Sequence, residues 1–167
     1  MGRPTIENIR SLGDFMVSNL WDINIIGAGS VFEAAGLNFR AVSCELPKRT
    51  GNSLEVNIRG QKIKQPGDYD YSGSITITLA EGDNAEVHKA ITVLRELTIT
   101  TLTNSQLPKK AVESVVTIKR LNRQGGISHG FIIRGAFLED YDLGELSDAG
   151  DIVQPTITLS YDYFIEL

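Results

Sequence analysis

Charged side chains are concentrated in two segments of opposite sign. Between positions 48 and 64 the chain has one acid, Glu55, against five basic residues, which are Lys48, Arg49, Arg59, Lys62 and Lys64. Between positions 139 and 151 it has no Lys or Arg but six acids, which are Glu139, Asp140, Asp142, Glu145, Asp148 and Asp151. Opposite charges on separate parts of one chain can steer copies of that chain into register. We therefore expect a basic arm and an acidic loop that contact each other between subunits.

The residues able to bind metals or act as nucleophiles are few and scattered. Neither histidine, His88 or His129, has another His or Cys nearby in the sequence. Zinc sites need such ligands clustered, so we expect no metal at either position. The single cysteine, Cys44, lies in an expected strand, where a buried structural role is more common than catalysis. One cysteine excludes a disulfide within the chain, which fits a reducing compartment.

Two motifs fall short of a cofactor or metal site. The segment Gly27-Ala28-Gly29-Ser30 has Phe32 where a dinucleotide-binding loop has its third glycine, and no helical pattern follows. The acidic segment contains Asp140-Tyr141-Asp142, but its remaining residues do not have calcium-loop spacing. We expect a turn at 27–30, no cofactor and no catalytic centre, so the chain is not expected to be an enzyme.

Length and composition fit one domain over residues 1–167. The chain is 41% hydrophobic and 22% charged, with a net charge of −5 and a pI near 5.0. That balance argues against tight sequence-independent binding of nucleic acid, which depends on Lys and Arg. No apolar run approaches the ~18 residues of a membrane span. Because Glu7 and Asp14 interrupt the N-terminal segment, we expect no signal peptide and synthesis in the cytoplasm.

Two segments have helical periodicity. At 5–20, Thr5 is an expected N-cap and Gly13 weakens the pattern by about 1 kcal/mol. Its apolar stripe is Ile6, Ile9, Leu12, Met16 and Leu20. At 84–98, Asp83 and Glu86 have the spacing of a capping box. Its apolar face is Val87, Ala90, Ile91, Leu94 and Leu97.

Period-two alternation predicts strands over most of the remaining chain. The expected strands are 21–25, 74–79, 112–122, 129–138 and 156–163, with a turn at 122–126. Residues 37–70 are expected to form a strand, a polar turn, a second strand and an extended basic arm, with the projecting hairpin over 46–68. The sequence therefore predicts a mainly β protein, an antiparallel sandwich or barrel with one packed helix and an N-terminal helix.

Several short motifs occur in a characteristic order. They are VSCELPKRT at 42–50, RGQKIK at 59–64, IRGAF at 133–137 and TITLSYDYF at 156–164. With the helix at 84–98, this order resembles the tail tube proteins of contractile-tailed bacteriophages of the T-even type. The resemblance extends over roughly residues 20–165.

The resemblance implies a structural virion protein that forms hexameric rings stacked into the inner tail tube. It implies that the 46–68 hairpin reaches a neighbouring subunit and that phage DNA passes through the lumen without specific binding. The implied partners are the tail sheath, the baseplate hub or initiator and the tail terminator, and the implied location is the virion tail. A baseplate tube initiator and a tube protein of a phage-derived injection machine remain alternatives.

A ligand-binding β-sandwich is an alternative of another class. Its stacking surfaces would come from exposed aromatic side chains. The candidates are Trp21, Tyr69, Tyr71, Tyr141, Tyr161 and Tyr163.

Overall fold

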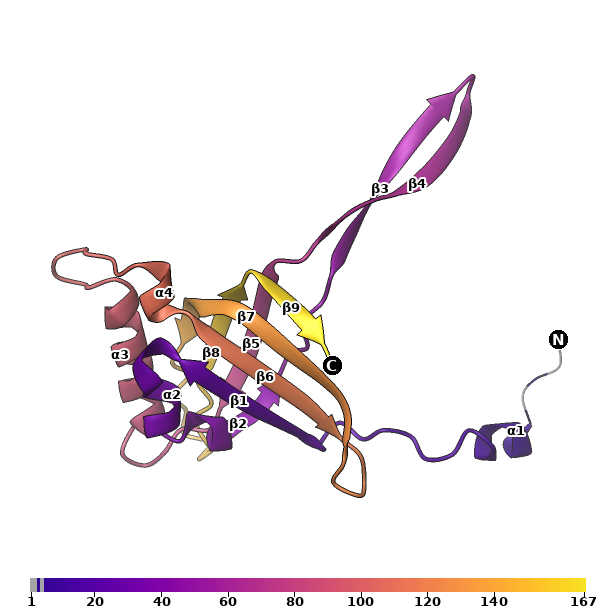
Figure 1. The fold of residues 1–167 in the computed structure, drawn as a ribbon. Helices are drawn as coiled ribbons and strands as arrows, with labels where there is room; N and C mark the ends of the chain where they lie inside the picture. The colour runs from indigo at the N-terminus through magenta and orange to yellow at the C-terminus, as the bar shows by residue number, and fades with distance from the viewer. Residues whose placement is uncertain (1–2, 4) are drawn as a thin grey trace.

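Antiparallel pairing joins most strands into one curled sheet in the computed structural model, which describes residue 3 and residues 5–167. In that part of the chain the sheet has seven strands, ordered β1-β6-β7-β8-β5-β2, with β9 on β7 (Figure 1). The strands are β1 (Trp21–Gly27), β2 (Ala41–Cys44), β5 (Gly73–Leu79), β6 (Ser114–Leu121), β7 (Ile127–Asp142), β8 (Thr156–Tyr161) and β9 (Tyr163–Glu166). The predicted mainly β, antiparallel class is confirmed.

The long strand β7 belongs to two halves of this sheet. Its first part pairs with β6 and β9, and its last part, 137–142, pairs with β8. Between the two parts Gly135 has φ +71°, which an L side chain rarely adopts. Opposite this kink the strand is interrupted at Asp162, whose backbone N–H donates to the Arg134 carbonyl at 3.1 Å. The predicted continuous strand 156–163 is therefore wrong, because Asp162 separates β8 from β9.

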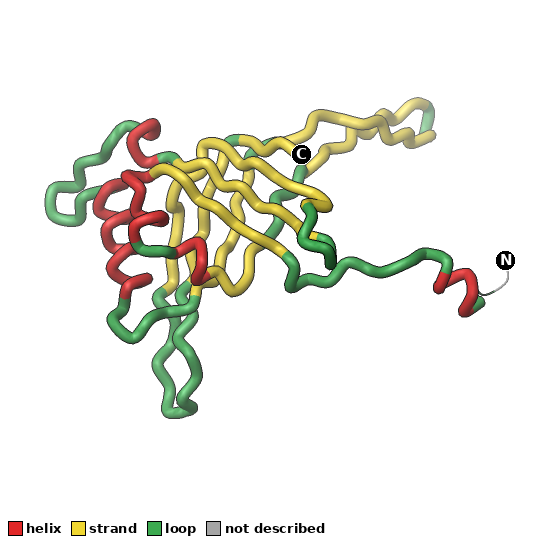
Figure 2. Tube along the Cα trace, turned by 60° about the horizontal axis from the view of Figure 1, so that its bottom comes forward, coloured by secondary structure: helices red, strands yellow, loops and turns green. Residues whose placement is uncertain are grey.

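Helix α3 (Glu86–Thr98) packs on the core at one end of the curled sheet (Figure 2). Of the predicted apolar face, Val87, Ala90, Ile91 and Leu94 are buried, and Leu97 is partly buried. The predicted capping box is wrong. The N-cap residue is Ala85, and the carboxylate of Glu81 instead accepts from the backbone N–H groups of Val87 and His88 at 2.9 and 3.0 Å.

The predicted N-terminal helix over 5–20 is also wrong beyond its first turns. Helix α1 spans only Ile6–Arg10, and the chain then runs extended to β1 (Figure 1). Thr5 is the N-cap, as predicted, and accepts from the Asn8 N–H at 3.4 Å. Gly13 has φ +76°, and α1 has no buried residue. A short helix is marginal without a packed face, so periodicity alone did not sustain it.

The secondary structure of residues 37–70 differs from the predicted strand, turn, strand and extended arm. Residues 37–40 form a 3₁₀ turn, β2 is only four residues long, and the arm is a hairpin of β3 (Thr50–Ile58) and β4 (Gln61–Asp70). The two-residue connection, Arg59 and Gly60, has φ +50° and +82°, typical of a tight hairpin turn. The hairpin projects from the sheet on the side away from α3 (Figures 1 and 2).

Short helices complete the fold. They are η1 (Ala28–Ser30) and α2 (Val31–Ala34) after β1, η2 (Leu37–Arg40) before β2, and α4 (Lys109–Val112) before β6. Gly27 begins the first of these turns, with φ +121°, and a Cβ there would lie 2.7 Å from the Glu113 carbonyl oxygen. The predicted turn at 27–30 is confirmed, but the expectation that no helix follows it is wrong, because α2 begins at Val31. Within the described residues, no helix has the length and apolar character that crossing a membrane requires.

Candidate subunit interface

The hairpin has one apolar face and one polar face. Residues opposite each other in an antiparallel pair share a face. Val56 lies opposite Ile63, and Leu54 and Ile58 flank that pair along β3. Leu54, Ile58 and Ile63 are 58%, 58% and 55% exposed. We call Leu54, Val56, Ile58 and Ile63 the apolar hairpin face. These side chains form an exposed apolar surface on a hairpin that has no further strand beside it among the described residues.

The opposite hairpin face carries most of the predicted basic arm. Glu55 lies opposite Lys64, and Asn57 lies opposite Lys62. The Lys62 ammonium forms an ion pair with Glu55 at 3.0 Å, with both side chains largely in solvent. Such an exposed pair contributes little stability. Arg59 is at the turn. Lys62, Lys64 and Arg59 are therefore exposed basic groups, of which Lys62 pairs with Glu55.

The root of the hairpin is tied to the sheet by aromatic contacts. The Arg49 guanidinium lies 5.2 Å from the Tyr71 ring centroid and 5.1 Å from that of Phe164. The buried Tyr161 hydroxyl donates to the Lys48 carbonyl at 3.4 Å. Arg49, which we predicted to contact another subunit, makes cation–π contacts within its own chain. These contacts fix the direction in which the hairpin leaves the body.

The predicted acidic loop is in part a strand. Glu139, Asp140 and Asp142 lie in β7, and only the acids further along lie in the connection to β8, at positions 145, 148 and 151. Asp140 accepts from the Tyr141 N–H, and Asp142 accepts from the Gly144 N–H. Within residues 5–167, no ion pair joins the basic and acidic segments.

The outward face of β1, β6, β7 and β9 carries apolar side chains together with Asp22, Asn24, Lys119 and Arg134. Register places Ile26 opposite Val115, and Ile132 opposite both Thr117 and Ile165. Ile26 and Ile165 are 50% and 45% exposed. Tyr163, on the same face, is 44% exposed. We call the patch made by Ile26, Val115, Ile132, Tyr163 and Ile165 the apolar sheet face; Thr117 and Arg134 lie among these side chains.

The outward face of β5 and β8 is a ladder of hydroxyl groups. Ser74 lies opposite Ser160, Thr76 opposite Thr158, and Thr78 opposite Thr156. Neither strand contains a charged residue. On the next strand, Asp140 and Asp142 lie opposite Thr158 and Thr156 and share their face. We call this surface the hydroxyl face.

The N-terminal segment adds further exposed apolar side chains. Ile6, Leu12 and Phe15 are 75%, 70% and 64% exposed. The Asp14 carboxylate forms an ion pair with Arg123 at 3.5 Å, beside the turn that follows β6. As predicted, that turn occupies 122–126.

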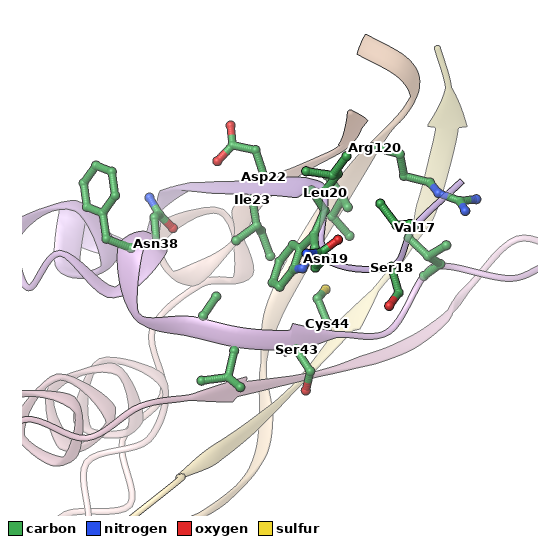
Figure 3. A pocket seen from close by; sticks show the side chains of 16 residues that line it. Val17, Ser18, Asn19, Leu20, Asp22, Ile23, Asn38, Ser43, Cys44 and Arg120 are labelled. Atoms are coloured by element: carbon green, nitrogen blue, oxygen red, sulfur yellow. The ribbon is translucent and has the colours of Figure 1, made fainter. Parts of the chain in front are cut away.

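A cleft of about 810 Å³ lies where the sheet stays open, between the edge strands β1 and β2 (Figure 3). The Asn38 amide caps part of the β1 edge, because its oxygen accepts from the Ile25 N–H at 3.1 Å. Burial, with a smaller effect from the adjacent Glu45, raises the pKa of Cys44 in this cleft to about 12. A thiol held in its protonated form is a poor nucleophile.

The two histidines remain apart in the fold. His88 lies on α3, and His129 on β7 stacks edge-on against Phe131 at 4.8 Å and faces Glu166 at 3.7 Å. In the described part of the chain, no three His, Cys, Asp or Glu side chains gather as a metal site would require. The aromatic side chains also do not form one surface, since Tyr161 is buried and Tyr141 accepts from Arg95 at 3.1 Å.

Sequence reasoning missed both apolar faces. The signal for the hairpin was present, because Leu54, Val56 and Ile58 alternate with polar residues beside a tight Arg-Gly turn. The prediction of a subunit contact was based on the basic residues, which lie mainly on the opposite hairpin face. The apolar sheet face had no such signal, since its members come from four strands and only the register brings them together.

No protein-family model and no curated protein sequence matches the chain. Solved structures do match. The tube-terminating cap of the anti-feeding prophage gives a TM-score of 0.64 at 16% identity, covering 92% of this chain and 91% of that chain. A chain of the sheath–tube complex of an extracellular contractile injection system, PVC, in its extended state also gives 0.64 at 16% identity, covering 98% and 97%. The SPP1 tail tube gives 0.52 at 11% identity, covering 91% and 78%. The chain therefore has the tail tube fold that the order of its motifs predicted.

Proposed function

We propose that this chain is the tube subunit of a phage-type contractile tail. Six copies form a ring, and rings stack into a hollow tube that starts on the baseplate, lies inside the sheath and ends at a terminator. The observation that carries the proposal is the projecting hairpin with an exposed apolar face. A monomer gains nothing from leaving these side chains in water, whereas a neighbouring subunit can cover them. The similarity in fold to components of tails and injection systems supports this function.

The charged segments act together with the apolar contacts in this proposal. Ring closure uses heterologous contacts, in which one surface of a subunit meets a different surface of the next. The basic side chains of the polar hairpin face and the acids at 145, 148 and 151 are suited to such a pair. Their attraction guides orientation and association rate more than affinity. Reversing both Lys62 and Lys64 to Glu should therefore slow tube growth in a salt-dependent way while leaving the subunit folded.

We assign the hydroxyl face to the wall of the channel. Its side chains hold water, and its carboxylates repel a polyanion, while β5 and β8 offer no cation to bind phosphate. DNA that passes this wall therefore meets no positively charged side chain on β5 or β8 that could bind its phosphates. The substitutions Thr76→Lys and Thr158→Lys together should leave tubes intact but make them retain DNA at low salt. Co-sedimentation of DNA with the tubes at two salt concentrations measures this.

A matched variant tests where the added charge acts. Thr103→Lys with Gln106→Lys adds the same charge to the exposed connection between α3 and α4. If the hydroxyl face lines the channel, only the Thr76 and Thr158 variant retains DNA that withstands nuclease. Equal retention and equal nuclease sensitivity in both variants would contradict the channel assignment.

The test of the function is assembly itself. The purified chain is examined by negative-stain electron microscopy beside light scattering, alone and after addition of preformed baseplates. Hollow tubes with six-fold end views are the expected product. Single rings that do not grow would indicate an initiator or terminator instead. A chain that stays monomeric even with baseplates would contradict the structural function and favour the ligand-binding alternative.

A further inference from the structure

Two exposed features of the subunit are left uncovered within the described residues. One is the N-terminal arm, which we define as residues 5–16 and which contains α1. The other is the cleft between the free edges of β1 and β2 (Figure 3). We propose that the N-terminal arm of one subunit lies in the β1–β2 cleft of a second copy of this chain. This inference rests on the proposed function and adds a subunit contact that is separate from the hairpin.

The N-terminal arm carries an apolar stripe that its own subunit leaves in water. Ile6 and Ile9 lie on one side of α1, Leu12 follows at helical spacing, and these side chains are 75%, 46% and 70% exposed. Away from this stripe, Glu7 and Arg10 form an ion pair with each other at 3.2 Å. The stripe is therefore uncharged, as in helices that bind in a groove. Because a short helix without a packed face is marginal in water, a covering surface would stabilise α1.

The cleft opens onto the hydrophobic core. Trp21 on β1 and Cys44 on β2 line it from opposite edges, and both are partly buried against the core. Val17 and Leu46 line the same cleft and are exposed. An apolar stripe laid in this cleft would continue the core at the place where the sheet stays open.

The charges of the two surfaces are compatible. The lining of the cleft carries one charge of each sign, on Asp22 and Arg120. Helix α1 likewise carries one acid and one base. With balanced charge on both surfaces, no net repulsion opposes the contact.

The direction of the N-terminal arm favours a second copy over the arm's own cleft. Its last residues lie beside the turn that follows β6, where Asp14 pairs with Arg123 at 3.5 Å and Phe15 and Met16 line a small cavity with that turn. This turn is at the β6 side of β1, whereas β2 lies across the cleft on the other side. Helix α1 then leaves the body on the side away from α3, as the hairpin does (Figures 1 and 2). The N-terminal arm therefore extends towards the same neighbours as the candidate subunit interface.

The connection to the body is long enough to reach another copy. Residues 11–20 separate α1 from β1 and can span up to about 33–36 Å when extended. Because different surfaces meet, the contact is heterologous and can repeat around a ring or from ring to ring. One chain carries both surfaces, so each copy supplies one N-terminal arm and receives one.

Fluorescence of Trp21 tests whether the cleft becomes filled. Trp21 is the single tryptophan of the chain and lines the cleft. On assembly it should lose most of its quenching by acrylamide. Replacing Ile6 and Ile9 by serine should raise the critical concentration for assembly about tenfold, and in the tubes that still form Trp21 should stay open to the quencher. Glu7→Ser with Arg10→Ser, on the charged side of α1, is the matched control and should behave as wild type.

Photo-cross-linking identifies the contact directly. In a Cys44→Ala background, a benzophenone maleimide is attached to Ile9→Cys, and these chains are assembled with heavy-isotope-labelled Cys44→Ala chains. We expect products that join position 9 to residues 17–23 or 41–46 of the heavy chain. The same label on Glu7→Cys should lose these products, because that side of α1 faces away from the cleft.

The outcomes separate this inference from the proposed function. Tubes in which Trp21 stays as open to acrylamide as in the monomer, or whose products join position 9 to other surfaces, overturn the docking and leave the tube function standing. Products confined to the light chain would show that the N-terminal arm fills its own cleft, which also overturns the docking. A chain that never assembles, with or without baseplates, contradicts both.

Discussion

Replacing Leu54 and Ile63 by serine should weaken assembly without unfolding the subunit. The two side chains are 58% and 55% exposed, so about half of their apolar surface remains to be buried. Complete burial of an aliphatic side chain contributes about 1.5–3 kcal/mol, so the pair should lose about 1.5–3 kcal/mol per contact. At 1.4 kcal/mol for each factor of ten, the critical concentration for assembly should rise about 10-fold to 100-fold.

Sedimentation of assembled material over a range of subunit concentrations measures this change. The subunit itself should keep its circular dichroism spectrum and its melting temperature, because the hairpin lies outside the hydrophobic core. Asn57→Ser, a change on the polar hairpin face, serves as the control and should leave the critical concentration within about twofold. Assembly of the double variant at the wild-type concentration would refute the argument that the apolar hairpin face is covered in the assembly.

Three further predictions concern the kink, the thiol and the root of the hairpin. Gly135→Ala should destabilise the subunit by about 2–4 kcal/mol in chemical unfolding, because of the positive φ and because the added Cβ would clash with the Asp162 side chain. Gly125→Ala shares the positive φ but has open space, so it should cost only about 1–2 kcal/mol, and equal losses would contradict the steric argument. Burial raises the pKa of Cys44 from 9.0 to about 12, so the free energy of unfolding should decline as the pH rises from 9 towards 12. Cys44→Ala should lessen that decline in unfolding experiments at a series of pH values. An unchanged pH profile would contradict the assignment of the decline to this thiol. Arg49→Gln should broaden the distance distribution between spin labels on the hairpin tip and the sheet, and an unchanged distribution would show that the cation–π contacts do not orient the hairpin.

Local patterns predicted the elements that local physics controls. Alternation located the strands, and the apolar face of residues 84–98 located α3 because that face is buried as a unit. The same reasoning was wrong for 5–20. The helix there ends at Arg10, and none of its apolar side chains is buried in the subunit. Periodicity shows that a segment can bury a face, but it does not show that a partner surface exists.

Capping and strand breaks depended on distant residues. Glu81 displaced the expected capping box because its carboxylate reaches two N–H groups at the start of α3. Asp162 interrupts a segment that alternates perfectly, because β7 kinks opposite it at Gly135. In both cases the decisive contact joins residues that no local pattern relates.

The sequence by itself determined the β class, the tail tube resemblance, the charged segments and the amphipathic alternation of β3, since these depend on residue order and short-range geometry. Only the tertiary structure decided which surfaces exist. Pairing across β1, β6, β7 and β9 assembled the apolar sheet face, and pairing of β5 with β8 aligned the hydroxyl face. Register sets which side chains become neighbours, and it arises from packing of the whole sheet, so no single segment contains it.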